Sequence, residues 1–464
     1  MLTYQDYEEY TGTQAEFLKQ AINEYIASDF YKTAEIADKY DRQQNVTINQ
    51  ASKMLFTLNR EKIEDCTSSN NQIPCNIFHR LITQRCMYSL GNGISFLKEG
   101  IKEKFGKKVD DVARAVGLSS LSGGVGYFYL ADRLYKFDAT EIVPLYDEYT
   151  GNIRAAIRHW KLNENKPMQI TFFEKDGYTQ YVDDKKDGMK IIKEKRPYIL
   201  KTVHTKAFGT EIVGFDNYPE VPIVPMWGSR LKQSALVGMR SAIDAIDLVQ
   251  SGFANNLSDC AEIYWLLQNA GGMTPNDMQK FRDRLLFNHI AATNSDEATI
   301  TPYTQEIPHE ARDKFLEYMR SQIYEGFGGL DVHTIAAGAT NDHIAAAYQP
   351  VDEEADDFEY QIIEAFEKLG ALLGLDPNDC IPQFNRNKQY NQAEFVDMVM
   401  QMSMYLDDET ILSKAPFITE DERKEILKRK AAEEQAKVVD LRAKLDELRT
   451  ETGETEGLTD GQSA

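Results

Sequence analysis

Apolar residues recur at alternating steps of three and four between Ser241 and Gln268, the spacing that places side chains on one face of a helix. Gln250 interrupts this stripe, and Gly252 weakens it because a glycine inside a helix costs about 1 kcal/mol relative to alanine. We expect an amphipathic helix that ends near Gln268 and that bends, or closely approaches another helix, near Gly252. An ordinary core helix is the alternative. The stripe consists of Ile243, Ile246, Phe253, Leu257, Cys260, Tyr264 and Leu267.

A short insert follows this helix. Thr274 is placed to cap a second, short helix, with Pro275 in its first position and Asp277 near its positive end. Two apolar runs, 288–292 and 298–303, flank a polar turn and predict a small strand pair. The short helix is basic and contains Lys280, Arg282 and Arg284.

A second long helix, a small-residue loop and a third long helix come next. From Pro308 onward, apolar residues spaced by four predict a helix that reaches Phe327. The loop from Gly326 to Asn341 is rich in glycine and alanine and carries almost no charge, so we expect it to be mobile or to approach another backbone closely. Asn341 or Asp342 is expected to cap a helix that runs to about Leu373. Pro350 should kink it, because an interior proline costs about 3 kcal/mol.

The remaining parts of the chain are simpler. Two helices, at about 14–27 and 78–90, precede a strand-rich region from Gly126 to Val224, and the alternation in 169–173 and 178–182 predicts a hairpin around an Asp-Gly turn. Near the C-terminus, Thr419 begins a capping box before a helix to about Arg449. The residues from Glu451 to Ala464 are polar, and we expect them to be disordered.

Taken in order, these segments resemble the portal proteins of tailed double-stranded DNA bacteriophages, of the siphophage type. The resemblance rests on the order helix, tip insert, helix, small-residue loop and kinked helix, and on short strings in the same order along the chain. The strings are YKTAEIADKYDRQQNVTI at 31–48, NQIPCNIFHRLITQRCMYSLGNG at 71–93, SGGVGYFYLADRLYKFDATEIVPLY at 122–146, VPIVPMWGS at 221–229 and NRNKQYNQAE at 385–394.

The resemblance implies an α+β, mainly helical portal fold that assembles as a ring, of about twelve copies, around a central channel. Its regions would be the wing (1–229), the stem helices (230–268 and 308–327), the clip (269–307), the tunnel loop (328–341), the long helix returning to the wing (342–418), the crown helix (419–450) and the tail (451–464).

The resemblance also implies functions for single residues and a set of partners. The tunnel loop would meet double-stranded DNA through Gly328, Gly329, Gly338, Thr340, Asn341 and His343. The clip, with Lys280, Arg282 and Arg284, would dock the terminase and later the head-to-tail adaptor. Major capsid and scaffolding proteins would surround the ring, which would sit at one capsid vertex of the virion after passing through the host cytoplasm.

Composition adds two constraints. The 464 residues are 42% hydrophobic, enough for a substantial core, and contain neither an apolar run of transmembrane length nor a signal-peptide pattern at the start. The net charge of −22, from 52 basic and 74 acidic side chains, disfavours tight nonspecific DNA binding and suits a wall past which DNA slides. Solubility is an equally good explanation of the charge. The five cysteines fit a reducing compartment.

A search for catalytic chemistry finds little. The phosphate-binding pattern G-x-x-x-x-G-K-[ST] is absent, and Ser122–Gly126 is better explained as a tight turn before a strand than as a dinucleotide loop. We therefore expect no enzyme activity, no cofactor and no metal. Six carboxylates in the eight residues 352–359 leave one alternative open, a metal-dependent nucleic-acid-processing enzyme, although a solvated helix face explains them more simply. Another alternative is a ring-forming head-to-tail connector.

Overall fold

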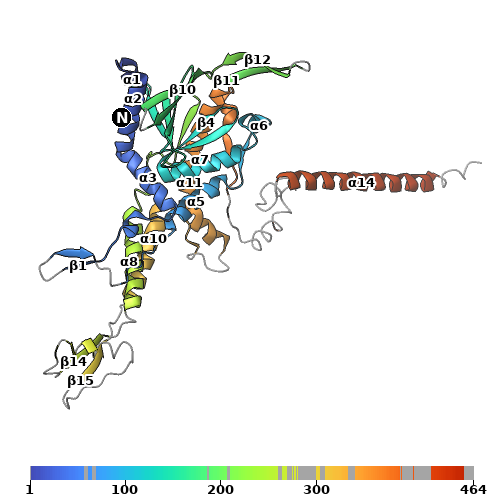
Figure 1. Cartoon of the computed structure of the whole chain (residues 1–464). Helices are drawn as coiled ribbons and strands as arrows, with labels where there is room; N and C mark the ends of the chain where they lie inside the picture. Colours follow the sequence, from blue (N-terminus) through green and yellow to red (C-terminus); the bar gives the residue numbers. More distant parts are fainter. Residues whose placement is uncertain are drawn as a thin grey trace, which may run out of the picture. The chain divides into compact units, whose positions relative to one another are not determined.

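The computed structural model describes most of the chain (Figure 1). The described residues are 2–56, 61–64, 69–184, 188–205, 209–259, 264–268, 274, 276–277, 279–280, 299–303, 309–332, 340–386, 388, 401 and 420–453. They fall into two compact units. The first comprises Met1–Thr334 and Ala347–Lys388, and the second comprises Ile335–Ala346 and Gln389–Ala464.

Helices and strands alternate irregularly along the chain. The helices are α1 (Tyr4–Glu9), α2 (Gln14–Ala27), α3 (Asp29–Asp41), α4 (Val46–Asn49), α5 (Ile77–Leu90), α6 (Ile101–Phe105), α7 (Val109–Gly123), α8 (Arg240–Asp259), α10 (His309–Phe327), α11 (Asn341–Leu372), the 3-10 turn η2 (Pro377–Cys380) and α14 (Glu420–Gly453). The strands are β1 (Met54–Phe56), β2 (Lys62–Glu64), β3 (Ile94–Phe96), β4 (Val125–Leu130), β5 (Leu134–Asp138), β6 (Ile142–Tyr146), β7 (Ile153–Trp160), β8 (Met168–Glu174), β9 (Gly177–Asp184), β10 (Gly188–Arg196), β11 (Ile199–Thr205), β12 (Gly209–Asp216), β13 (Ile223–Trp227), β14 (Tyr264–Gln268), β15 (Thr299–Tyr303) and β16 (Pro382–Phe384).

The strand-rich region is confirmed as two antiparallel sheets with small accessory sheets. One sheet has the order β10-β9-β8-β7-β6, and the other has the order β13-β4-β5. The predicted hairpin is β8 and β9, although Gly177 already pairs with Glu174, so the two turn residues are Lys175 and Asp176 rather than Asp-Gly. The tight turn at 122–126 is also confirmed, because Gly124 has φ +91° between α7 and β4.

The main core lies where α5, α7 and α11 meet the smaller sheet. Its centre is aromatic: Phe366 is fully buried and lies 5.3 Å from Phe105 and 5.7 Å from Phe128, between ring centroids. A second core forms where α2 covers the five-stranded sheet, with Phe17 and Phe172 among its buried members. The α8–α10 pair belongs to the same unit, and Ile243, Ile246 and Ile323 of these helices are buried members of the main core.

His159 is a buried imidazole in β7, between these layers. It stacks on Tyr31 at 6.4 Å between centroids, and its Nε2 has no hydrogen-bond partner among the described residues. Desolvation by burial lowers the pKa of His159 to about 4. Because that folded-state pKa is below the unfolded value of about 6.5, the stabilising contribution is complete above that pH and is lost as pH falls toward 4.

We therefore expect the protein to lose about 2 kcal/mol of unfolding free energy through His159 between pH 7.5 and pH 5. Urea unfolding at both pH values, compared with the His159→Phe variant, measures this contribution. The variant keeps an aromatic ring against Tyr31 but cannot take up a proton, so its pH dependence should be flatter by that amount. Parallel pH profiles for the two proteins would contradict the expectation.

The two predicted long helices are α8 and α10, which pack against each other (Figure 1). His309 meets the Phe253 ring edge-on at 5.5 Å, and the Arg312 guanidinium lies over the same ring. The first helix was predicted to reach Gln268, which is wrong: α8 ends at Asp259, and Tyr264–Gln268 is strand β14. The apolar run Tyr-Trp-Leu-Leu suits either state by pattern, and its pairing with β15 decides for the strand.

That pairing also changes the predicted strand pair of the insert. The second run is confirmed as a strand, β15, but its partner is β14. The other predicted run, 288–292, lies outside the described residues. The close helix contact expected at Gly252 is wrong as well, because no described atom lies within 4 Å of where a Cβ would stand.

One face of α8 is polar and binds the backbone of the extended segment 71–75. Asp247 Oδ1 accepts from the backbone N–H of Cys75 at 2.7 Å, and Ser251 Oγ accepts from that of Ile73 at 2.9 Å. Asn255 Oδ1 accepts from the N–H of Asn71 at 2.5 Å, which completes a ladder. Successive side chains of the ladder are four residues apart on the helix, a rise of about 6 Å. Their backbone partners are two residues apart on the extended segment, a rise of about 6.6 Å, so the two spacings match. Of the apolar stripe, Ile243 and Ile246 are buried, whereas Leu257 is 51% exposed.

In the second unit, α14 confirms the predicted C-terminal helix. It extends to Gly453, so the first residues of the predicted disordered tail are helical; the rest of the tail lies outside the described residues. Two apolar residues of this helix, Val438 and Leu441, are about half exposed. Among the helices that the structure describes, none combines the length and the apolar character needed to cross a membrane.

Candidate functional site

The predicted tunnel loop begins at a tightly built helix end. Gly328 has φ +66°, and the N–H groups of Gly328 and Gly329 donate back to the carbonyls of Glu325 and Tyr324 at 3.1 and 2.8 Å. This is a glycine-terminated helix end, which positive φ makes easy only for glycine. A Cβ on Gly328 would lie 2.6 Å from Glu354 Cγ, and one on Gly329 would lie 2.7 Å from Leu81 Cδ2. The start of the loop is therefore packed against α11 and α5.

Two neighbouring side chains of α5 hold this helix end. Gln84 makes a two-way bond to the backbone of Leu330: its Nε2 donates to the carbonyl at 2.9 Å, and its Oε1 accepts from the N–H at 3.0 Å. Arg85 donates to the Phe327 carbonyl, pairs with Glu354 at 3.0 Å, and stacks over the Phe327 ring at 3.8 Å. We call Gln84, Arg85 and residues 327–330 the loop anchor.

Arg85 is nearly buried, with 10% of its side chain exposed. Desolvation lowers the pKa of its guanidinium, an effect that the charge of Glu354 opposes, and the group stays protonated because an arginine pKa lies so far above neutrality. Further along the loop, Arg320 pairs with Asp331 at 3.0 Å. The anchor thus ties α10, α5 and α11 together at the residue where the predicted loop leaves the helix.

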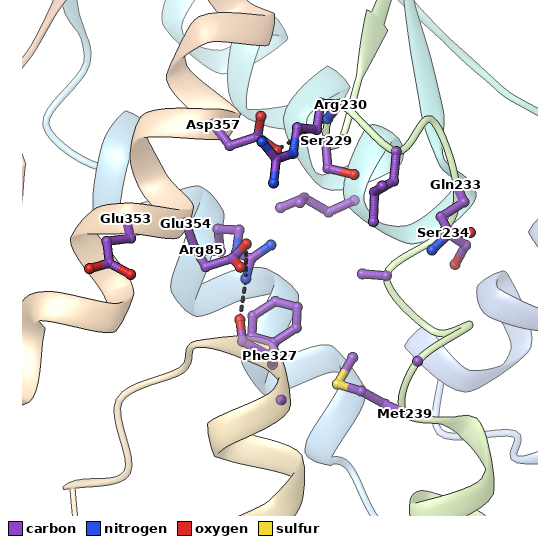
Figure 2. Close-up of a pocket in the computed structure, with 16 residues that line it drawn as sticks. Arg85, Ser229, Arg230, Gln233, Ser234, Met239, Phe327, Glu353, Glu354 and Asp357 are labelled. Atoms are coloured by element: carbon purple, nitrogen blue, oxygen red, sulfur yellow. Dashed lines mark hydrogen bonds and ion pairs between the residues drawn. The ribbon is translucent and has the colours of Figure 1, made fainter.

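A cavity of about 440 Å³ opens beside the loop anchor. Figure 2 shows Arg85 pointing at Phe327 and Glu354 on one side, with Gln233, Ser234 and Met239 across the space. Asp357 accepts a hydrogen bond from the backbone N–H of Arg230 at 3.1 Å. The walls come from α5, α10, α11 and the segment that leads into α8, so the cavity lies where the α8–α10 pair meets the rest of the first unit.

The acidic run 352–359 is not the solvated face that we expected. Arg386 binds Glu359 with two nitrogens, at 2.9 and 2.8 Å, binds Asp352 at 3.0 Å and also contacts Asp356. Lys388 adds a second cation on Asp352 at 2.7 Å. Glu359 is only 8% exposed. The hydrogen bonds that Arg386 donates to Glu359 and Asp356 raise the pKa of its guanidinium, so the group stays charged.

These contacts bear on the metal alternative. Tyr88 donates to Asp352 at 2.6 Å, so that carboxylate already has three partners. Although desolvation works against it, hydrogen bonds from Lys388 and Tyr88 keep the pKa of Asp352 below its usual value. Over the described ranges of the chain, acidic, histidine and cysteine side chains nowhere gather in a group that could hold a metal ion. Three carboxylates of the run, Asp352, Asp356 and Glu359, form an ion-pair network that fastens Arg386 and Lys388 to α11.

The predicted site residues belong to two different units. Gly328 and Gly329 belong to the loop anchor, whereas Thr340, Asn341 and His343 belong to the second unit. Thr340 precedes α11 and its Oγ1 hydrogen-bonds His343 Nδ1 at 2.8 Å, so Thr340, rather than Asn341 or Asp342, stands at the start of that helix. Gly338 lies outside the described residues. Contact of these residues with DNA stays a prediction, as does the kink at Pro350.

The predicted clip residues are described only in part. Thr274 and Asp277 form the expected reciprocal cap, with Thr274 N–H donating to Asp277 at 3.1 Å and Asp277 N–H donating to Thr274 Oγ1 at 3.3 Å. Lys280 is exposed in the short helical segment that follows. Arg282 and Arg284 lie outside the described residues. The sequence analysis missed Gln84, Arg85 and Arg386. Their sequence signal is weak, because α5 contains a second arginine, Arg80, and Arg386 stands within the string NRNKQYNQAE.

Comparison with known proteins gives the family. A sequence profile described as phage portal protein, SPP1 Gp6-like, matches residues 23–437. A portal protein of Clostridium phage phiCD119 is 24% identical over 442 residues, which cover 88% of this chain and 95% of that protein. Chains in the necks of native and empty GTA particles align with 76% of this chain at 12% identity and a TM-score of 0.39, covering 89% and 90% of their own lengths. Because the profile spans most of the sequence, the chain belongs to the SPP1 Gp6-like family of phage portal proteins.

Proposed function

We propose that this protein forms a ring around a channel through which double-stranded DNA enters the capsid during packaging and leaves it at infection. Family membership supports a structural role at a capsid vertex of the virion. The observation that carries the channel proposal is the loop anchor, which fixes the start of a small-residue loop to a helix pair and a rigid core. A channel wall needs a loop that is held at a defined position along the channel and that does not bind DNA strongly. The net charge of −22 is consistent with weak binding to DNA.

The regions of the ring follow with corrected bounds. We assign the wing to the first unit up to about Ser229 and the stem to α8 and α10. The clip is the segment between these helices, and it now includes strand β14. Residues 328–341 are the tunnel loop, and α14 is the crown. Terminase and the head-to-tail adaptor would dock at the clip through Lys280, Arg282 and Arg284, with major capsid and scaffolding proteins around the wing.

Native mass spectrometry and negative-stain imaging of the purified full chain test this proposal. We expect a ring of about twelve subunits with a bore of about 20 Å, the width of a DNA duplex. A protein that stays monomeric at every concentration, also with scaffolding protein present, would contradict the proposal. Closed rings whose bore is too narrow for duplex DNA would instead favour the connector alternative.

A further inference from the structure

Strand β10 exposes an unusual surface at the edge of the five-stranded sheet. Among the described residues it pairs only with β9, so its other edge is open. Ile191 and Ile192 are 58% and 52% exposed, and Leu200 and Phe215 in the adjoining β11–β12 sheet are 53% and 63% exposed. Open apolar edges invite pairing with other chains, and proteins commonly protect or cover them.

This edge is also basic in an acidic protein. Between 188 and 201 the sequence has four lysines, one arginine and one glutamate, a formal charge of +4 in a chain of net charge −22. Lys195 pairs with Glu174 at 2.9 Å and Lys201 with Asp216 at 2.7 Å. Lys193 and Arg196, by contrast, form no ion pair within the described part of the chain. Lysines alone would protect an edge, but protection does not explain two exposed isoleucines beside them.

An acidic surface of the opposite character lies on α1. Residues 2–27 carry four glutamates, one aspartate and one lysine, a formal charge of −4. Glu8 and Glu9 are exposed in the last turn of α1, which has no basic residue. Carboxylates are disfavoured there because the C-terminal end of a helix carries partial negative charge. No described residue forms an ion pair with either glutamate, and the exposed Tyr10 ring follows them.

We propose that the exposed β10 edge of one copy, together with the neighbouring Leu200 and Phe215, docks on the acidic face (Glu8, Glu9 and Tyr10) of a second copy. We call this edge surface, with Ile191, Ile192, Lys193 and Arg196, the basic face. This inference rests on the proposed function: in the proposed ring, the contact would join the wings of neighbouring copies. A two-fold dimer that placed the basic face on itself would bring like charges together. A head-to-tail contact pairs opposite charges at every interface, and it closes into a ring when the rotation fits.

Charge reversal tests the contact in the full-length protein. We compare Lys193→Glu/Arg196→Glu, Glu8→Lys/Glu9→Lys and the four-site combination with the wild type. Lys104→Glu/Lys107→Glu is the matched control, because it makes the same charge change at exposed sites on and beside α6. Sedimentation and native mass spectrometry over a range of concentrations give the subunit concentration at half assembly, and urea unfolding verifies that each variant folds.

Each single-face reversal should raise the concentration at half assembly about tenfold or more, since like charges then face each other. The four-site combination should return it to within about threefold of wild type, and the control should not move it. Raising the salt from 0.1 M to 0.5 M should weaken the wild-type ring, because exposed pairs are screened.

The remaining outcomes separate the explanations. Rings that tolerate both single-face reversals would overturn the proposed contact while leaving the proposed function intact. Failure of the combination to restore assembly would show that the two faces do not meet. Intact rings that lose binding to a short DNA duplex on reversal of the basic face would assign that face to nucleic acid. A wild-type protein that forms no ring would overturn the proposed function, and this contact with it.

Discussion

Replacing Arg386 with alanine should lower the free energy of unfolding by about 4 kcal/mol at pH 7, because removing one partner of a buried ion pair leaves the other charges uncompensated. Glu359 would lose the guanidinium that binds both of its oxygens, whereas Asp352 would keep Lys388 at 2.7 Å. Glu359 has little access to solvent, so water cannot replace the guanidinium. The loss should shrink at pH 5, where the unpaired carboxylates can take up protons.

Urea unfolding of the variant at both pH values measures this effect. Arg42→Ala is the matched control: Arg42 also pairs with an aspartate, Asp38 at 3.0 Å, but its side chain is 67% exposed. An exposed pair of this kind contributes about 0.5 kcal/mol or less. Arg386→Lys keeps the charge but not the bidentate contact with Glu359, so it should fall between the two. Equal losses for the Arg386 and Arg42 variants would mean that the acidic run is solvated after all.

The Arg386 network also marks the limit of what the sequence could predict. Six acids in eight residues stand out in the sequence, and either a solvated face or a metal site explains them by pattern. The choice between these two explanations depends on Arg386, a cation that is more than 25 residues away in an irregular segment. Periodicity predicts which residues of one helix share a face, but it says nothing of which distant segment covers that face.

Elements with strong local signals were predictable. The helix at Gln14–Ala27 has the predicted bounds, because Thr13 and Glu16 form a reciprocal cap and apolar residues follow at helical spacing. The end of α8 was not predictable in the same way. Tyr264–Gln268 continues the apolar stripe of the helix, and only the tertiary pairing with Thr299–Tyr303 makes it a strand.

The loop anchor shows the same limit at the candidate site. The glycines after Phe327 predict a helix end, and the structure confirms one. The two side chains that hold it lie on α5, about 240 residues earlier, and three of their bonds go to backbone atoms, which have no sequence signature. From the sequence, the loop was expected to be mobile or to approach another backbone closely. Its first residues follow the second expectation, because a Cβ on Gly328 would lie 3.2 Å from the Pro350 carbonyl oxygen.

Changing Arg85 to methionine should destabilise the protein by about 3 kcal/mol, because the Phe327 carbonyl loses its buried donor and Glu354 loses its cation. Methionine keeps much of the length and apolar volume of the side chain, so the change removes the charge and the donors rather than the packing. The start of the predicted tunnel loop should loosen even where the protein remains folded. Faster hydrogen exchange at the Leu330 amide, which Gln84 holds, would report this directly.

Arg80→Met is the control for this change, because Arg80 is an exposed arginine on the same helix, and its loss should cost no more than about 0.5 kcal/mol. Under the proposed function, rings of the Arg85 variant should still assemble below its unfolding temperature but should package DNA less efficiently than rings of the Arg80 variant. An Arg85 variant with normal exchange at Leu330 and normal packaging would show that the helix end is fixed by its glycine cap alone. If the Arg85 variant lost stability but packaged DNA normally, Arg85 would stabilise the fold without contributing to packaging. The loop would then act independently of the helix from which it extends.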